Sequence, residues 1–405
     1  MQWILVVAGA GLVVAGLTAQ APHVTVIADV TVVDVVAGVP RPHQTVIVRN
    51  ALIETVGPAA DVKAPAGARV IDASGKFLIP GLWDMHVHLN GDGMLLGRFL
   101  AAGITGIREM GDSLAPLVEA RRLISSGQWE GPRLVLSGPM LRGPQSPTDT
   151  SGGGSRVVRT PEEARQAIAE LDSLGVDFIK IQDYLSRDTY FAIAEAARAH
   201  GKKFAGHVPI DVSPAEASDA GEYSIEHFDW LPKRCAALFM EEEDNIKAMP
   251  ADLCGEAAVD VILQRLVRNG TWLCPTIAQF QYLSPGHWRA IFAGFTRQVP
   301  ALRRSGARIL AGTDWQRSLE ARGGPAGLTL HEEMLALVEA GFTPIEALRA
   351  ATSNPAEYFG MSKELGSIEA GKIADLVLLT ADPLADIRNT ESIDLVMHDG
   401  QLSHR

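Results

Sequence analysis

Two histidines, His86 and His88, lie one residue apart near the end of the apolar segment 77–89 (FLIPGLWDMHVHL). The segment is typical of a β-strand, and side chains alternate between the two faces of a strand, so both imidazoles are expected on one face. A pair of imidazoles on one face is a suitable start for a metal site. The same pattern also fits two buried histidines whose ring nitrogens bond to backbone carbonyls. The rest of the chain must distinguish these interpretations.

The middle of the chain alternates short apolar runs with helical segments. With the His86 segment there are eight such runs, the others being residues 104–107, 134–136, 178–181, 204–206, 224–226, 272–274 and 309–311. Eight β/α steps predict an α/β fold, a distorted TIM (β/α)8 barrel over residues 80–362.

Four helix starts carry a Ser/Thr/Asn-Pro-x-Glu pattern, beginning at Thr160, Ser213, Thr343 and Asn354. The first residue caps the helix, proline suits the first turn, and the glutamate can bond back to the cap.

Both chain ends have the alternating pattern of strands. Strand-like runs fill residues 24–56, and others occupy residues 373–379 and 394–398. Neither end has enough strands for a stable unit of its own. We therefore expect residues 22–79 and 363–405 to combine into one small β-sandwich domain.

Chemistry in such barrels sits where the strands end. The predicted strands carry or are followed by polar residues that suit a metal site: His86, His88, Lys180, His207, His227 and Asp314. Four histidines, one lysine and one aspartate are thus expected at one mouth.

These motifs give the chain its resemblance to a known family. The His86-x-His88 pair, the run 311–315 (AGTDW) and the tail 365–377 (LGSIEAGKIADLV) resemble the metal-dependent amidohydrolase superfamily. Within it, the imidazolonepropionase-like and prolidase-like (Xaa-Pro dipeptidase-type) group is the most similar. The resemblance covers nearly all of the chain after its N-terminal segment.

The resemblance implies a role for each predicted ligand. His86, His88 and Asp314 would bind one divalent ion, and His207 and His227 a second, with zinc favoured by this ligand set. Lys180 would bridge the ions as a carbamate formed with CO₂. An ammonium group has no lone pair for a metal, whereas a carbamate is an anionic oxygen ligand. The alternative for Lys180 is a salt bridge at a strand end.

The resemblance also implies a reaction, hydrolysis of an amide bond by a metal-bridged hydroxide, with Asp314 carrying the proton to the leaving amine. Related deaminases have a glutamate three residues after the fifth-strand histidine, and here that residue is Ile210. The favoured substrates are therefore small amides, either dipeptides or N-acyl amino acids. An imidazolonepropionase-like cyclic amide hydrolase, a deaminase and a metal-free binding protein remain alternatives.

Residues that follow the strands are candidates for substrate binding. Tyr184, Arg142, Trp230, Trp315 and Arg317 could contact a carboxylate or an apolar side chain, and His331 lies in a helix start near the last strand. Each could equally be an ordinary loop or core residue.

Composition and the chain start bear on partners and location. The net charge of −12 and the lack of a basic stretch argue against nucleic acid. Residues 3–17 are apolar and residues 19–21 fit a small-x-small cleavage site, so residues 1–21 are expected to be a signal peptide of an exported protein. A buried first strand and an uncleaved membrane anchor are the alternatives. A homo-oligomer is compatible with the sequence.

The three cysteines have no metal-binding spacing. In an exported chain Cys235 and Cys254 are expected to form a disulfide, while Cys274, in an apolar run, is expected to be a buried thiol.

Overall fold

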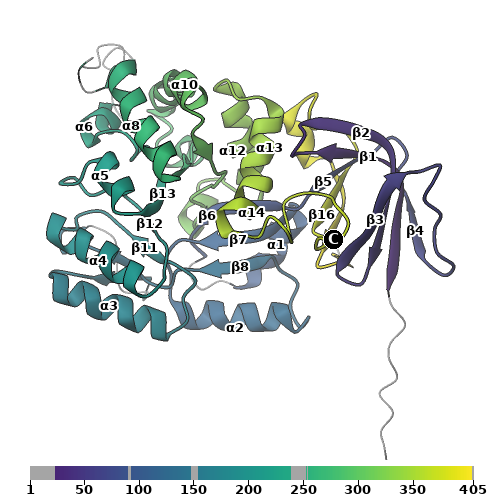
Figure 1. Ribbon diagram of the computed structural model, residues 1–405, viewed down its shortest axis with the longest axis horizontal. Coiled ribbons are helices and arrows are strands. Elements are labelled where there is room, and N and C mark those ends of the chain that lie inside the picture. The colour runs from purple at the N-terminus through teal and green to yellow at the C-terminus, as the bar shows by residue number, and fades with distance from the viewer. Residues whose placement is uncertain (1–22, 90–92, 147–153, 239–251, 253, 404–405) are drawn as a thin grey trace, which may run out of the picture.

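The computed structural model describes residues 23–89, 93–146, 154–238, 252 and 254–403. Strands from both ends of the chain lie together beside a larger α/β region (Figure 1). The expected signal peptide, residues 1–21, lies outside the described residues. Within these residues, no helix has the length and apolar character needed to cross a membrane.

The strands of the two chain ends form one eight-stranded sheet. Its members are β1 (Val24–Asp34), β2 (Val39–Arg49), β3 (Leu52–Pro58), β4 (Arg69–Asp72), β5 (Phe77–Pro80), β16 (Leu376–Leu379), β17 (Ile393–His398) and β18 (Gln401–Leu402). The antiparallel pairing of β16 with β5 joins the C-terminal strands to the N-terminal ones.

This sheet is continuous, and the small β-sandwich predicted from the sequence is not clearly shown. The reason lies in β1, which pairs with β4 near Thr25 and with β5 near Thr31, with register shifts in its pairing to β2 in between. Such irregularities bend a strand. The bent sheet encloses its own apolar core, which includes Ile27, Val46 and Leu376.

Each of the eight apolar runs of the middle region contains a strand. Where this region is described, its strands are β6 (Leu82–Val87), β7 (Ile104–Glu109), β8 (Arg133–Leu136), β9 (Met140–Arg142), β10 (Ser155–Val157), β11 (Ile179–Ile181), β12 (Phe204–Gly206), β13 (Glu222–Glu226), β14 (Trp272–Cys274) and β15 (Arg308–Ile309). They form a sheet β6-β7-β8 and a sheet β10-β9-β11-β12-β13-β14-β15, with all pairings parallel.

The two sheets close into a distorted barrel. On one side β8 and β9 follow each other across a turn at Gly138, whose φ of 66° is a left-handed conformation that suits glycine. On the other side Met85 N donates to Ala311 O at 2.9 Å, and Val87 bridges to Trp315 in parallel. The third barrel strand is therefore split, and its halves pair with different neighbours.

Helices lie between the barrel strands and cover their outer surface, further helices follow β15, and η2 lies between β16 and β17 (Figure 1). They are η1 (Gly93–Leu95), α1 (Leu96–Ala101), α2 (Leu114–Ser125), α3 (Pro161–Ser173), α4 (Arg187–Ala199), α5 (Pro214–Asp219), α6 (Lys233–Leu238), α8 (Glu256–Asn269), α9 (Phe280–Leu283), α10 (Trp288–Ser305), α11 (Arg317–Glu320), α12 (Leu328–Glu339), α13 (Pro344–Ala351), α14 (Ser353–Phe359) and η2 (Ile387–Glu391).

Three of the four predicted helix starts are confirmed. Thr160, Ser213 and Thr343 each accept a bond from the backbone N–H three residues on, and the last two form complete capping boxes. The prediction at Asn354 is wrong, because α14 already begins at Ser353. The Asn354 side chain instead donates to Ile309 O at 2.8 Å and ties α14 to β15.

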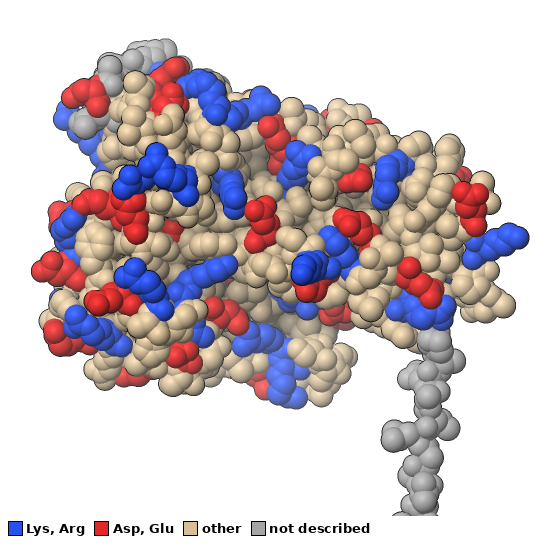
Figure 2. Space-filling model, in the orientation of Figure 1, with Lys and Arg blue, Asp and Glu red and all other residues tan. Residues whose placement is uncertain are grey.

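Cys235 and Cys254 form the predicted disulfide, and Cys274 is a buried free thiol. On the face in Figure 2, Lys and Arg side chains are interspersed with Asp and Glu. This face therefore has no extended basic surface of the kind that binds a phosphate backbone.

Candidate metal centre

The six predicted ligands come from the ends of different barrel strands. His86 and Lys180 lie in β6 and β11, and three others directly follow β6, β12 and β13: His88, His207 and His227. Asp314 lies in the segment that follows the short β15. The structure brings the imidazoles and the carboxylate together. Asp314 Oδ1 is 3.4 Å from His86 Nε2 and 3.2 Å from His88 Nε2, and its Oδ2 is 3.9 Å from His227 Nε2.

The remaining histidine completes the group. His207 Nε2 lies 3.1 Å from His227 Nε2. Two imidazole lone pairs at this distance repel each other unless a proton or a cation lies between them. The same applies to the carboxylate oxygen of Asp314 beside the nitrogens of His86 and His88, so the donor set fits divalent cations.

The outward-facing nitrogens of these rings are engaged by other groups. Nδ1 contacts Glu226 Oε2 at 2.8 Å in His86, Gly111 O at 3.2 Å in His88, Asp183 Oδ2 at 3.1 Å in His207 and Thr276 Oγ1 at 2.6 Å in His227. Carbonyl and ionised carboxylate oxygens only accept, so in the first three rings Nδ1 carries the proton. Their Nε2 lone pairs are then available to a metal, which is how protein partners orient metal-bound histidines.

Three of the four histidines are suited to remain neutral, whereas the pKa of His88 is raised: burial would lower it, but its hydrogen bond to Asp314 and the charge of that carboxylate outweigh burial. Burial lowers the pKa of His86 and of His207, and lowers that of His227 to about 4. Burial would raise the pKa of Asp314, but the surrounding histidines outweigh it and hold the pKa well below its usual range. Neutral imidazoles and an ionised carboxylate are the ligand states that metal binding requires.

Lys180 is a buried amine at the centre of the barrel. Its side chain is 1% exposed, and its Nζ has neither a hydrogen bond nor an ion pair among the described residues. The alternative interpretation was a salt bridge of Lys180 at a strand end, and the described residues contain no acidic partner for it. Burial lowers the pKa of Lys180, which favours the neutral amine, the form that can react with CO₂.

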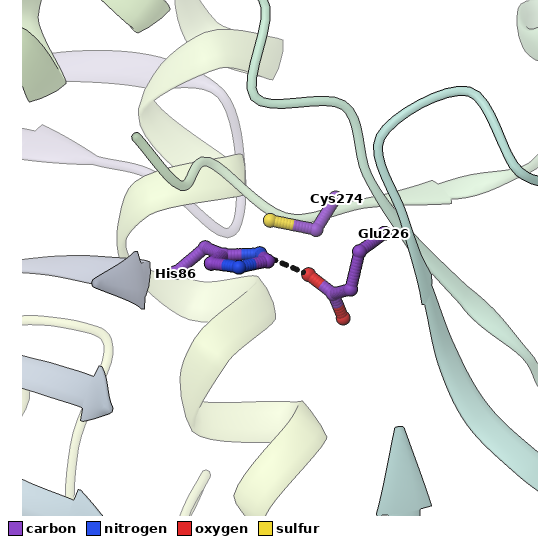
Figure 3. Close-up of side chains that lie close together, drawn as sticks. All are labelled: His86, Glu226 and Cys274. Carbon is purple, nitrogen blue, oxygen red and sulfur yellow. Dashed lines mark hydrogen bonds and ion pairs between the residues drawn. The ribbon is translucent and has the colours of Figure 1, made fainter. Parts of the chain in front are cut away.

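Glu226 is a site residue that was missed at the sequence level. Both of its oxygens lie 2.9 Å from Arg108 Nη2, and one of them also accepts from His86 (Figure 3). Ser224 and Glu226 are two residues apart in β13 and so lie on the same face of the strand, a pattern that could have identified them as interior residues. The nearby Cys274 thiol has its pKa raised by burial. Arg108 already balances the charge of Glu226. Glu226 therefore orients His86, and the group His86, Glu226 and Cys274 does not form a second metal site.

A second missed group ties β6 to the strand end that carries Asp314. The buried Asp84 accepts from Thr313 Oγ1 at 2.7 Å, Thr313 N at 3.0 Å and His86 N at 3.2 Å. Burial raises its pKa to about 7. The bonds position the backbones of two proposed ligand segments, 86–88 and 313–314, relative to each other.

Two site residues have a strained backbone. His227 and Asp314 have φ values of 54° and 51°, in the left-handed region that costs energy for residues other than glycine. Such conformations cluster at functional sites, where the surrounding structure enforces them. Here the turns lie at His227, directly after β13, and at Asp314, in the segment that follows β15.

The predicted substrate residues differ in exposure. Tyr184 is 48% exposed after β11, and Arg317 begins α11. Arg142 ends β9, is buried and donates to Ser146 O. Three further side chains are also enclosed by protein: Trp230, Trp315 and His331. The substrate roles of all six stay predictions.

Packing accounts for the burial of Trp230, Trp315 and His331. Trp230 packs on Phe228, and Trp315 donates from Nε1 to Gly324 O. His331 contacts Thr390 Oγ1 and Ala102 O through its two ring nitrogens, and burial lowers its pKa to about 4.

Residues 77–402 match the sequence profile of the Amidohydrolase family. The chain belongs to this family. Members of the family are hydrolases that typically bind divalent metals, and the residue groups described above are of that kind.

Individual relatives differ in activity. The chain is 28% identical to an adenine deaminase of Rubrobacter xylanophilus over 91% of its own length but only 55% of the length of that protein. It is 26% identical to ochratoxinase of Aspergillus niger, covering 89% of this chain and 82% of the relative. It is 25% identical to imidazolonepropionase of Pseudomonas syringae, covering 84% and 88%.

A solved structure from Bifidobacterium longum, assigned as a prolidase, has a similar fold. It is 26% identical, with a TM-score of 0.75 over 95% of both chains. The predicted imidazolonepropionase-like and prolidase-like resemblance is thus confirmed, while the relatives share a fold and not one substrate.

Proposed function

We propose that this amidohydrolase cleaves the amide bond of a dipeptide or an N-acyl amino acid with the help of two divalent ions, most suitably zinc. The observation that carries the proposal is the convergence of the Nε2 atoms of His86, His88 and His227 on Asp314, with the Nε2 atom of His207 3.1 Å from that of His227. The same barrel holds the buried Lys180 amine, which has no hydrogen-bond partner among the described residues. Nitrogen and carboxylate ligands in this number suit zinc.

Each residue has a distinct place in the proposed site. His86, His88 and Asp314 would bind the first ion, and His207 and His227 the second. The neutral Lys180 amine would attack CO₂, form an N–C bond and lose a proton, giving a carbamate that bridges the ions. Such ions lower the pKa of water and polarise a substrate carbonyl.

Asp314 is proposed to move the proton. Its pKa lies well below the usual range, so the carboxylate is ionised at neutral pH and can accept a proton. Oδ1 lies close to two imidazoles, whereas Oδ2 is 3.9 Å from the nearest one described, His227. Oδ2 is therefore the oxygen proposed to take the proton from the attacking water and to give it to the leaving amine.

The side chain three residues after His207 favours an amide over a ring amine as substrate. Ile210 stands there and is 74% exposed, so it supplies no acid to the site. The ochratoxinase and prolidase names of two similar proteins support the same choice. A cyclic amide hydrolase or a deaminase is the second candidate, supported by the imidazolonepropionase and adenine deaminase relatives.

The test is a substrate panel with zinc-loaded protein. Dipeptides and N-acyl amino acids are compared with cyclic amides and aminated nucleobases, and release of free amino acid is followed separately from release of ammonia. We expect turnover of peptides or N-acyl amino acids. Ammonia released from nucleobases, with no cleavage of any acyclic amide, would replace this proposal by the deaminase.

A further inference from the structure

A lysine at the rim of the barrel joins two carboxylates that the sequence did not single out. Lys233 begins α6, and its Nζ lies 2.7 Å from Asp229 Oδ1 and 3.2 Å from Asp183 Oδ1. The two aspartates come from different loops, after β11 and after β13. The lysine therefore links the loops after β11 and β13, the two strands that flank β12.

Both carboxylates hold the segment of His207. Asp183 Oδ2 accepts from His207 Nδ1 at 3.1 Å, and Asp229 Oδ2 accepts from Val208 N at 3.1 Å. Asp229 Oδ2 is also 3.8 Å from His207 Nδ1. One carboxylate fixes the imidazole ring and the other fixes the backbone beside it.

The charge balance of the cluster depends on Lys233. Asp183, Asp229 and His207 have the spacing of a cation site, but the ammonium group of Lys233 already supplies the positive charge. Without it, the two carboxylates would repel each other. Asp183 has the more exposed side chain, 33% against 10% for Asp229, and would turn toward solvent and away from His207.

The chain around Lys233 is held firmly. Cys235, two residues on, is fully buried and bonded to Cys254, which lies just before α8. Its backbone N–H also donates to Pro232 O at 2.7 Å. Lys233 is thereby fixed over the two aspartates.

We propose that Lys233 is a positioning residue for His207: it holds Asp183 and Asp229 together, they keep the proton on Nδ1, and Nε2 is left to bind the second ion. The inference rests on the proposed two-ion function. It concerns no step of the reaction itself.

The experiment compares three variants with the full-length wild type. Lys233→Met removes the charge and keeps an unbranched side chain, and Lys233→Arg keeps the charge. Lys202→Met is the matched control, because Lys202 Nζ forms a similar pair, 3.2 Å from Asp172 Oδ1, on the outside of the barrel. Zinc affinity is measured by competition with a chelator. The protonation of His207 is measured in metal-free protein by nitrogen NMR of the imidazoles.

Lys233→Met should bind the second ion about 10–100-fold more weakly, the usual effect of losing a partner of a metal-bound histidine. The first ion should be unaffected, Lys233→Arg should regain most of the affinity, and Lys202→Met should match the wild type. In the metal-free protein, Lys233→Met should show a mixture of His207 tautomers where the wild type has Nδ1–H.

Equal second-ion affinities and identical His207 spectra in the wild type and Lys233→Met would overturn the positioning role and leave the two-ion site standing. A loss of affinity as large in Lys202→Met as in Lys233→Met would also overturn it. A wild type that binds no zinc would instead overturn the proposed function.

Discussion

A cluster of histidine and carboxylate side chains lies at the barrel mouth, and another lies at the β17–β18 hairpin. At the mouth, Asp314 lies among the Nε2 atoms of three histidines. At the hairpin, His398 Nδ1 is 2.9 Å from Asp375 Oδ1, and His398 Nε2 is 3.6 Å from Asp399 Oδ2. Both clusters have the spacing of a cation site.

The difference lies in how the charge is balanced. Arg133 Nη2 lies 2.7 Å from Asp399 and 3.6 Å from Asp375, so the hairpin carboxylates already have a cation. At the mouth the corresponding basic residue is Lys180, and burial lowers its pKa, which favours the uncharged amine. Residue types and spacing alone therefore do not define a metal centre; the free lone pairs and the missing positive charge do.

The largest effect on turnover is expected from replacing Lys180, with the replacement of Arg133 as the comparison. Lys180→Ala should reduce turnover to near the background rate, because the proposed bridging ligand is gone, and short carboxylic acids should restore part of it. Arg133→Ala should keep its turnover at neutral pH. Steady-state rates with and without added propionate measure both. An undiminished rate in Lys180→Ala would exclude the carbamate.

The next largest effect on turnover is expected at Asp314, with Asp375 of the hairpin cluster as its comparison. Asp314→Asn retains an oxygen ligand but cannot carry a proton at neutral pH, so turnover should fall by about 10²–10⁴, the usual worth of a positioned acid or base. Most bound metal should remain. Asp375→Asn should have nearly wild-type turnover. If Asp314→Asn turns over at the wild-type rate, another group carries the proton.

Metal content gives a third comparison. Replacing His207 and His227 together by alanine should lower the zinc content by about one ion per chain, because the other ligands can still bind the first ion. His398→Ala should leave the content unchanged. Elemental analysis after reconstitution measures both. A lower zinc content in His398→Ala would show that the hairpin cluster also binds metal.

The sequence predicted the mouth ligands because two simple rules place them. Alternation along a strand puts His86 and His88 on one face, and barrel topology brings His207, His227 and Asp314 to the same edge. Both rules depend only on local pattern. The same local patterns predicted three helix caps, while Asn354 failed because its side chain bonds to a strand 45 residues away.

The groups behind the ligands were not predictable in this way. Glu226 meets His86 across 140 residues, and Thr313 meets Asp84 across 229. Such pairs depend on how the closed barrel places one strand against another, and no spacing motif encodes them. The bend of the terminal sheet was not predictable for a similar reason, since the change of partners along β1 becomes visible only in the pairing.

The Cys235–Cys254 disulfide is expected to stabilise the folded protein. The Cys235–Cys254 bond closes a loop beside the mouth, with a sequence separation of 19. Replacing both cysteines by alanine should lower the free energy of unfolding by about 3 kcal/mol in the chain-entropy model. Urea unfolding measures the loss. Unchanged stability, with three free thiols in the wild type recovered from an oxidising compartment, would refute the bond.

The smallest expected effect is the loss of folding stability at acid pH that comes from Asp375 in the hairpin cluster. Burial would raise the pKa of Asp375, but His398 and Arg133 outweigh it, so the pKa is lower than in the unfolded chain. The unfolded state therefore takes up the proton first, and the stability contributed by Asp375 is present above about pH 4 and is lost as the pH falls further.

Asp375→Asn should reduce this acid sensitivity. At pH 7 the variant should be less stable than the wild type by about 1–3 kcal/mol, the usual cost of losing a buried charged hydrogen bond, and the difference should shrink below about pH 4. Urea unfolding of metal-free protein between pH 7 and pH 3 measures it without interference from metal release. Asp399→Asn is the control, because Asp399 has a 49% exposed side chain and should have a smaller effect. If the stability difference between wild type and Asp375→Asn stays constant down to pH 3, the hairpin carboxylate is not held ionised by His398 and Arg133, and the contrast between the two clusters fails.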